Sequence, residues 1–278
     1  MIQQLINFLK VIRWKNILIY STLQFLLYFV LFEQNFSFTN GWIFLGLSIL
    51  SLVIFGNIQN NLIDYELDKN KPEFVDYGKT PLLVWTIIFL ILGVIFGFTS
   101  FYMTFSPTVL YAILSFPLLL SLYNLYLKKL PLVGNLLIGL VTVLAIYIPV
   151  AYTKGIHYQI HAFYFLLIMG FLLTTMRELI KDMEDIYYDK AFGYKTLPII
   201  SLKTSIAVYS LLIILFFYFL FRFKPDLNGF IFKTLLVTGI LFALVSIKLI
   251  KEKYYKELTQ IIKLMMIIGF LSLVFLSD

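Results

Sequence analysis

Long uninterrupted runs of apolar residues dominate the sequence. The clearest extends from Pro81 to Leu127, 47 residues without Asp, Glu, Lys or Arg, and only the turn-like triplet 105–107 interrupts it. A helix needs about 20 apolar residues to cross a hydrocarbon core of about 30 Å. This stretch therefore predicts two membrane-spanning helices joined by a tight turn.

The same pattern, followed along the whole chain, predicts nine spans. Their ranges are 16–33, 41–63, 81–104, 107–127, 131–153, 159–180, 202–221, 228–248 and 258–277. Helices are favoured over the strands of a membrane barrel, because such strands alternate in polarity whereas these runs are apolar on every side. We therefore predict an all-α, polytopic membrane protein, with nine transmembrane helices in a single domain over residues 1–278.

Composition supports this fold class and excludes others. Hydrophobic residues make up 61% of the chain and charged residues 13%, against about 45–50% and about 25% in soluble domains. An ordinary soluble enzyme is therefore excluded. The chain contains no cysteine, which also excludes disulfides, thiolate metal sites and cysteine nucleophiles.

Basic residues concentrate on alternate connections between the predicted spans. The N-terminus and the connections on its side of the membrane carry 18 Lys and Arg residues, and the opposite side carries 4. Because Lys and Arg gather on the cytoplasmic side, the N-terminus is predicted to be cytoplasmic, and an odd number of spans then places the C-terminus outside. The net charge of +7 reflects the same bias, so no nucleic-acid partner is predicted.

Acidic residues are as unevenly distributed, with ten of the 15 in two connections predicted to be cytoplasmic. The first cluster reads GNIQNNLIDYELDKNKPE from position 56. Within it, Asn57, Asn61, Asp64 and Asp68 are spaced 4, 3 and 4. This spacing predicts that the four side chains share one face of a helix at the end of the second span.

A second acidic cluster repeats this geometry at the end of the sixth span. It reads RELIKDMEDIYYDKAFGYKTLP from position 177, with Asp182, Asp185 and Asp189 spaced 3 and 4. Each of these residues lies 121 positions beyond a polar residue of the first cluster, at 61, 64 and 68. Stacked carboxylates repel one another, so the repeat predicts a cation between the clusters.

The ligand chemistry favours magnesium. Oxygen ligands without His or Cys suit Mg²⁺, which commonly binds through a few carboxylates together with substrate phosphates. Arg177, Lys181 and Lys128 add positive charge, a combination that suits a diphosphate. No Gly-rich phosphate loop or Walker pattern is present, so a nucleotide is not the predicted ligand. The predicted metal ligands are Asp64, Asp68, Asp182, Asp185 and Asp189.

At these residues the sequence resembles the UbiA family of membrane-embedded prenyltransferases. The family signature NDxxDxxxD is similar to the segment with Asn60, Asn61, Asp64 and Asp68, and the signature KDxEDxxxD to the segment that begins at Lys181. Weaker family positions are matched by Arg13, Asn16, Tyr123 and Lys128. Within the family, the motifs look most like those of archaeal-type digeranylgeranylglyceryl phosphate synthases.

The resemblance implies nine helices around a central cavity that opens toward membrane lipids. It implies that the acidic motifs hold Mg²⁺ and the diphosphate of an allylic prenyl donor, and that a lipophilic acceptor captures the prenyl group. The implied catalytic residues are Asp64, Asp68, Asp185, Asp189 and Lys181. The implied substrate-binding residues are Asn57, Asn60, Asn61, Arg177, Tyr123, Lys128, Arg13 and Asn16. The acceptor stays open between an ether-lipid glycerol phosphate, an aromatic quinone precursor, a tetrapyrrole and a sugar-like head group.

Two positions depart from the family pattern. Asn61 stands where the family usually has Asp, and Tyr188 stands where Gly is common. An amide at position 61 can still offer an oxygen to a metal-bound water or a hydrogen bond to Asp64. The departure at Asn61 leaves open a non-catalytic family member that binds prenyl diphosphate. A separate alternative is a cation-coupled transporter, which is expected to carry ionisable residues near the bilayer midplane.

Overall fold

The structure, a computed structural model, describes residues 2–31, 40–69, 74–152 and 160–271, and all regular structure in these ranges is helical. The helices are α1 (Ile2–Val11), α2 (Trp14–Leu31), α3 (Asn40–Ile63), α4 (Tyr65–Asp68), α5 (Lys79–Thr104), α6 (Pro107–Leu125), η1 (Leu127–Lys129), α7 (Val133–Tyr152), α8 (Ile160–Glu184), α9 (Ile186–Ala191), α10 (Leu197–Ile200), α11 (Leu202–Arg222), η2 (Lys224–Asp226), α12 (Gly229–Glu252) and α13 (Tyr255–Leu271). The prediction of an all-α fold is confirmed.

Seven of the described helices are long and apolar enough to cross a membrane, namely α3, α5, α6, α7, α8, α11 and α12. The first and last predicted spans correspond to α2 and α13. Their predicted ends at 33 and 277 lie outside the described residues. Nine spans therefore stays a prediction.

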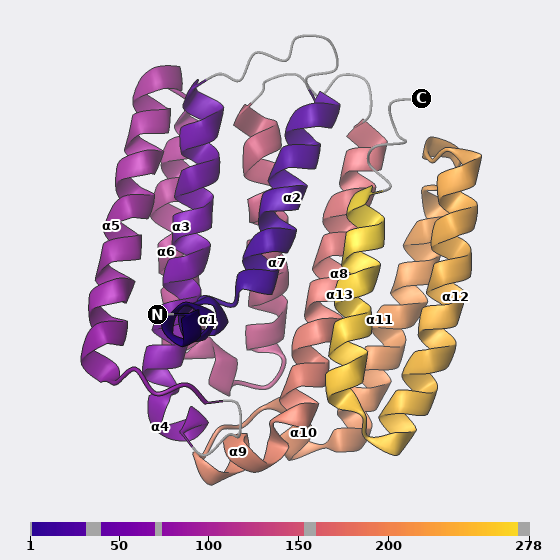
Figure 1. Cartoon of the computed structure of the whole chain (residues 1–278). Helices are drawn as coiled ribbons and strands as arrows, with labels where there is room; N and C mark the ends of the chain where they lie inside the picture. Colours follow the sequence, from indigo (N-terminus) through magenta and orange to yellow (C-terminus); the bar gives the residue numbers. More distant parts are fainter. Residues whose placement is uncertain (1, 32–39, 70–73, 153–159, 272–278) are drawn as a thin grey trace.

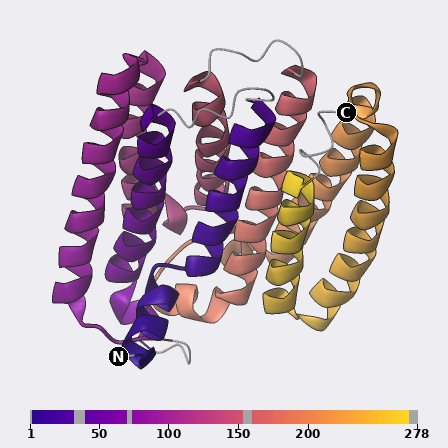
Figure 2. The same ribbon diagram turned by 45° about the horizontal axis from the view of Figure 1, so that its top comes forward.

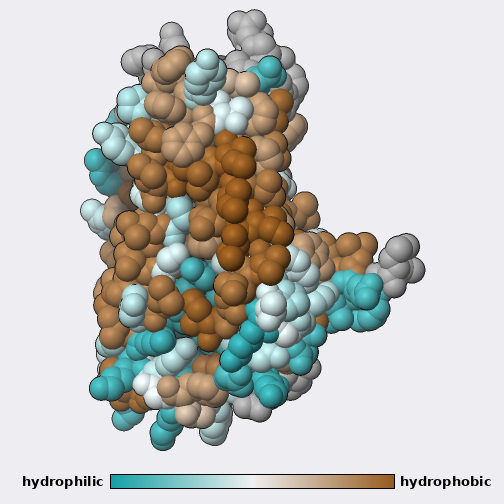
Figure 3. All heavy atoms as spheres, turned by 90° about the vertical axis from the view of Figure 1, so that its left-hand side faces the viewer, coloured by the Kyte–Doolittle hydropathy of each residue, from teal (hydrophilic) through white to brown (hydrophobic). Residues whose placement is uncertain are grey.

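The outer surface carries an apolar belt. Figure 3 shows this belt on the side of the molecule formed by α5, with hydrophilic residues gathered below it. Along α5, Leu83, Ile87, Ile91 and Ile95 are each about half exposed, and their spacing of four gives the helix an outward apolar stripe. Such exposure suits a surface covered by lipid chains instead of water.

The long helices form two groups with α2 and α7 between them (Figure 1). The helices α3, α5 and α6 pack together on one side, and α8, α11, α12 and α13 on the other. Leu52 and Phe116 belong to a buried cluster of the first group, and Met176 and Ile262 to a larger one of the second. Because α7 packs on both α6 and α8, it joins the two groups.

Glycine allows close packing in the first group. A Cβ atom added at Gly97 of α5 would clash with Cγ1 of Ile113 in α6 and would lie 2.9 Å from Oγ of Ser48 in α3. Ser48 also donates a 2.7 Å hydrogen bond to the carbonyl of Gly93 in α5. Small residues in membrane bundles let helix backbones approach in this way. The contacts fix α3, which carries the first acidic motif.

Both acidic motifs lie where a long helix is interrupted. Asp64, between α3 and α4, has φ −86° and ψ 8°, and Asp185, between α8 and α9, has φ −89° and ψ 5°. These nearly equal angles fall in a sparsely populated region where active-site residues are frequent. The repeat found in the sequence is thus also a repeat of backbone geometry. The helical bonding nevertheless continues through this point, because the N–H groups of Asp64 and Asp68 bond to the carbonyls of Asn60 and Asp64 at 2.9 and 2.7 Å.

The two motifs lie at the same end of the bundle, where α4, α9 and α10 gather (Figure 1). A helix that the sequence did not predict, α1, lies near this end and extends outward from the bundle (Figure 2). Its last residue Val11 and the following Ile12 pack against Ile58 of α3 and Leu82 of α5. The chain then turns at Arg13, whose φ is 57°, so Arg13 lies beside the first motif.

Candidate active site

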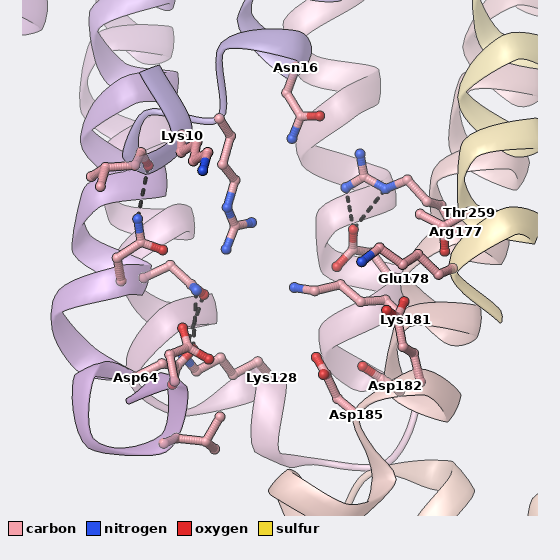
Figure 4. Close-up of a pocket in the computed structure, with 18 of the residues that line it drawn as sticks. Lys10, Asn16, Asp64, Lys128, Arg177, Glu178, Lys181, Asp182, Asp185 and Thr259 are labelled. Atoms are coloured by element: carbon pink, nitrogen blue, oxygen red, sulfur yellow. Dashed lines mark hydrogen bonds and ion pairs between the residues drawn. The ribbon is translucent and has the colours of Figure 1, made fainter. Parts of the chain in front are cut away.

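A cavity of about 500 Å³ lies between the two acidic motifs. One wall is formed by α3 and α4 and the other by α8 and α9, and the α1–α2 turn and α13 also line it (Figure 4). Thirteen predicted site residues line this cavity: Arg13, Asn16, Asn60, Asn61, Asp64, Asp68, Tyr123, Lys128, Arg177, Lys181, Asp182, Asp185 and Asp189. The remaining one, Asn57, lines an adjoining pocket of about 130 Å³. The structure therefore brings all of them into one region.

Asp64 accepts hydrogen bonds from three side chains. Lys128 Nζ lies 2.6 Å from Asp64 Oδ2, and the Asn60 amide donates to the same oxygen at 3.1 Å. The hydroxyl of Tyr194, which follows α9, donates to Asp64 Oδ1 at 3.0 Å. Burial, with Asp64 beside it, raises the pKa of Tyr194 above its usual value, so the hydroxyl keeps its proton and stays a donor. This bond links the segment after the second motif to the first motif.

The second motif is also held from outside its own helix. Asn135 of α7 donates its amide N–H to Asp182 Oδ2 at 2.8 Å. Thr196 Oγ1 donates to Asp189 Oδ2 at 3.4 Å, and Asp189 is buried. These bonds fix the carboxylates before any ligand arrives, which reduces the ordering cost of binding.

Arg177 and Glu178, adjacent on α8, form an ion pair inside the cavity. Arg177 donates from both Nε and Nη2 to Glu178 Oε1, with the Nε bond at 3.0 Å. Tyr123 of α6 donates its hydroxyl proton to Glu178 Oε2 at 3.3 Å. Figure 4 shows this pair on the same wall as Lys181, Asp182 and Asp185. Glu178 was not predicted as a site residue. In the structure only 6% of its side chain is exposed.

Asn57 and Asn61 contact the backbone of the N-terminal segment. The Asn57 amide donates to the carbonyl of Ile12 at 3.0 Å, and the Asn61 amide donates to the carbonyl of Val11 at 2.9 Å. The two bonds hold the turn that places Arg13 in the cavity.

The departure at position 61 has a structural reason. The hydrogen bond to Asp64 that we expected from Asn61 comes from Asn60 instead. The Asn61 N–H is used on a carbonyl oxygen, and an ionised Asp has no proton to donate there. Asn61 therefore maintains the α1–α2 turn in a way that the usual family residue does not reproduce.

Sequence reasoning missed the contribution of α13. Four of its side chains line the cavity: Lys256, Thr259, Gln260 and Lys263. Lys263 is one of the 18 basic residues counted above on the cytoplasmic side, although it lies inside the predicted span 258–277. An ionisable residue within an apolar span is a sign of function, and it pointed to this helix. Other cavity residues missed include Lys10, Lys15, Glu178, Glu184 and Tyr194.

The donor atoms of the cavity fit Mg²⁺ that arrives with a phosphate ligand. No three carboxylates or histidines among the described residues are close enough to hold a metal ion by themselves. The acidic residues instead stand on two facing walls. Mg²⁺ commonly uses one or two carboxylates and completes its coordination with water and substrate phosphates. The ammonium of Lys128 lies 2.6 Å from Asp64 Oδ2, so this carboxylate already stabilises one positive charge in the cavity.

An apolar helical bundle with a polar cavity at one end, lined by two facing carboxylate motifs and by cations, defines an integral membrane protein that can hold a polyanion next to the lipid phase. The model of the UbiA prenyltransferase family matches residues 15–273. The chain therefore belongs to this family and is a UbiA-type prenyltransferase, and the resemblance found in the sequence is confirmed. Family membership does not favour the transporter alternative.

Curated relatives agree with this assignment. The chain is 30% identical over 234 residues to digeranylgeranylglyceryl phosphate synthase of Methanobrevibacter smithii, which covers 78% of the chain and 80% of that protein. It is 29% identical over 263 residues to the synthase of Methanococcus aeolicus, covering 86% of the chain and 89% of that protein.

Solved structures share the fold. A structure of digeranylgeranylglyceryl phosphate synthase matches with a TM-score of 0.72 at 23% identity, covering 99% of both chains. A UbiA homolog from Archaeoglobus fulgidus, solved with GPP and Mg²⁺, matches with a TM-score of 0.63 at 16% identity, covering 96% of this chain and 99% of that one. At these identities the structural likeness concerns the fold.

Proposed function

We propose that this protein transfers an isoprenyl chain from an allylic prenyl diphosphate to the hydroxyl group of an ether-lipid glycerol phosphate, and releases diphosphate. The observation that carries the proposal is the cavity in which carboxylates and cations of both motifs face one another. The relatives named digeranylgeranylglyceryl phosphate synthase support the ether-lipid acceptor over an aromatic quinone precursor.

The diphosphate is proposed to bind between the two walls of the cavity. Figure 4 shows Lys181 pointing from α8 toward the wall that carries Asp64 and Lys128. These two lysines, with Arg177, supply positive charge to the phosphate oxygens. The proposed metal ligands are Asp64, Asp68, Asp182, Asp185 and Asp189. Mg²⁺ held there supplies positive charge that stabilises the leaving diphosphate.

The adjoining pocket suits the isoprenyl chain. It shares Arg13, Asn16 and Tyr123 with the cavity, so the two are continuous. Its apolar lining comes from several helices: Ile19, Leu23, Phe116, Leu120, Met266 and Phe270. An apolar lining favours a hydrocarbon chain and excludes water, which would otherwise compete as the nucleophile.

The proposed reaction exchanges one C–O bond for another. The bond between the allylic carbon and the diphosphate breaks, and its electron pair leaves with the diphosphate. The hydroxyl oxygen of the acceptor forms the new bond to that carbon, and the hydroxyl proton passes to the released diphosphate. The ring faces of Tyr20 and Tyr123, which line the adjoining pocket, can stabilise positive charge that develops on the allyl group.

The site end of the bundle is proposed to face the cytoplasm, because the connections at this end carry most of the basic residues. The predicted external C-terminus lies outside the described residues. We expect single cysteines introduced at Lys190 and Lys253 to react with an impermeant reagent only after the membrane is opened, and one at Lys224 to react in intact cells. The reverse pattern would invert the orientation.

Metal removal tests the proposed function directly. The purified protein is incubated with labelled geranylgeranyl diphosphate and geranylgeranylglyceryl phosphate, and the lipid product is measured. We expect excess chelator to abolish transfer and added Mg²⁺ to restore it, since the two carboxylate motifs would repel an uncompensated diphosphate. Full turnover in chelator contradicts the metal role. Donor binding without transfer to any acceptor supports the non-catalytic alternative instead.

A further inference from the structure

The helix α1 is amphipathic and extends outward from the bundle near the site end. Leu5, Ile6 and Leu9 are spaced so that they share one face of the helix. Leu5 is 59% exposed and Ile6 is 41% exposed. On another face, the Gln3 side chain donates a 3.0 Å hydrogen bond to Asn7. Figure 3 shows α1 projecting at the right, with hydrophobic residues on its upper side and hydrophilic residues beneath.

The contacts of α1 place it at the level where α5 enters the apolar belt. The hydroxyl of Tyr77 donates to the carbonyl of Gln4 at 2.8 Å. The ring of Trp85 lies edge-on to that of Phe8, with 5.1 Å between the ring centroids. Tyr77 and Trp85 flank the start of α5, one of the helices long enough to span a membrane, and Tyr and Trp are enriched where lipid chains meet water. The apolar face of α1 therefore adjoins the lower part of the belt (Figure 3).

The end of α1 is capped by the helix that carries the first acidic motif. The carbonyls of Val11 and Ile12 come at the end of α1, where no further turn of the helix supplies an N–H donor. Asn61 and Asn57 of α3 donate to these carbonyls at 2.9 and 3.0 Å. The next residue is Arg13, which lines the cavity. A displacement of α1 would therefore also displace Arg13.

We propose that α1 is an interfacial helix that docks on the membrane surface at the site end, with Leu5 and Ile6 among the outer parts of the lipid chains. Amphipathic helices of this kind lie in the interface plane with the apolar face buried. Lipid is favoured as the occupant over a second copy of the chain, because the exposed face adjoins a belt that lipid chains cover.

Docking of α1 on lipid also has a consequence for the cavity. The docked helix holds the turn at Arg13, so the membrane surface contributes to the geometry of the site. The effect on donor binding rests on the proposed function, whereas the docking on lipid does not.

Spin labels on single introduced cysteines test the docking, since the chain has no cysteine of its own. The whole protein is reconstituted into vesicles of phosphatidylcholine and phosphatidylglycerol, with labels at positions 3, 5 and 6. Collisions with oxygen report lipid chains, and collisions with a water-soluble nickel chelate report water. A label at Leu83, on the exposed face of α5, is the lipid reference, and one at the exposed Lys190 is the water reference.

We expect the labels at Leu5 and Ile6 to resemble the one at Leu83, and the label at Gln3 to resemble the one at Lys190. Labels at 5 and 6 that collide with the chelate as freely as the water reference would overturn the docking. Labels shielded from both reagents would overturn it too, since a second copy or another protein would then cover the face.

Paired substitutions test the link to Arg13. Leu5→Glu/Ile6→Glu places two charges on the apolar face and should raise the donor KM about tenfold, the size of a charged hydrogen bond lost from Arg13. The matched control is Gln3→Glu/Gln4→Glu, which adds the same charge at exposed polar positions and should leave the donor KM unchanged. An unchanged donor KM in the first variant, whatever its kcat, would overturn the link. Absence of transfer by the wild-type protein would contradict the proposed function alone, because the spin-label result needs no turnover.

Discussion

Asp68→Asn and Asp185→Asn are each expected to lower prenyl transfer at least about a hundredfold, which is the size of loss seen when one group that stabilises developing charge is removed. The two residues stand on facing walls of the cavity and lie near the diphosphate in the proposed complex. Either substitution removes one negative charge from the metal-binding set and leaves the side-chain size almost unchanged. The measurement is the transfer rate with labelled geranylgeranyl diphosphate at saturating Mg²⁺.

Glu252→Gln provides the control for this pair. Glu252 is an exposed carboxylate that ends α12 and does not line the cavity, so its loss should leave the rate unchanged. Near-normal rates in both Asp variants would show that the active site lies elsewhere in the protein. A smaller defect that high Mg²⁺ repairs would instead show that the affected carboxylate contributes affinity and not rate.

Glu178→Gln is expected to destabilise the protein by about 3 kcal/mol and to remove most activity, because it leaves the Arg177 guanidinium buried without its counter-ion. The pair is well enclosed, with side-chain exposures of 19% for Arg177 and 6% for Glu178. The amide also weakens the hydrogen bond from Tyr123, whose hydroxyl now donates to a carboxylate oxygen. Thermal unfolding in detergent measures the stability change.

The double variant Arg177→Met/Glu178→Met separates the buried charge from general packing. Removing both charges should recover much of the lost stability, since replacing a whole buried pair is often neutral, while activity should stay low because Arg177 lines the cavity. Equal instability of the double and single variants would indicate that shape, and not charge, governs this position.

The sequence predicted the architecture well because a membrane imposes a simple length rule. The second span was predicted to end at 63, where α3 ends, and the turn at 105–107 separates α5 from α6 as expected. The acidic motifs were found because their spacing repeats, and repeated carboxylates have no structural need. Family membership confirms the family resemblance that these motifs carry.

The partners of the motif residues could not be predicted, because they come from distant parts of the chain. Tyr194 reaches Asp64 across 130 positions, and Asn61 reaches Val11 across 50. Spacing identifies which residues share a helix face, but not which backbone or helix faces them. Lys263 was missed for a different reason. The rule that assigns basic residues to loops was applied to this lysine, although it lies within α13 and lines the cavity.

The two interrupted helices have a consequence for how ligands affect the whole protein. Asp64 and Asp185 belong to different helix groups, and a diphosphate with its metal would contact both. Such a ligand acts as a cross-link between the groups, so its binding free energy is added to the cohesion of the bundle. At a hundredfold excess over its dissociation constant, the gain is about 2.7 kcal/mol. Binding of the substrate therefore stabilises the helical bundle of the enzyme that uses it.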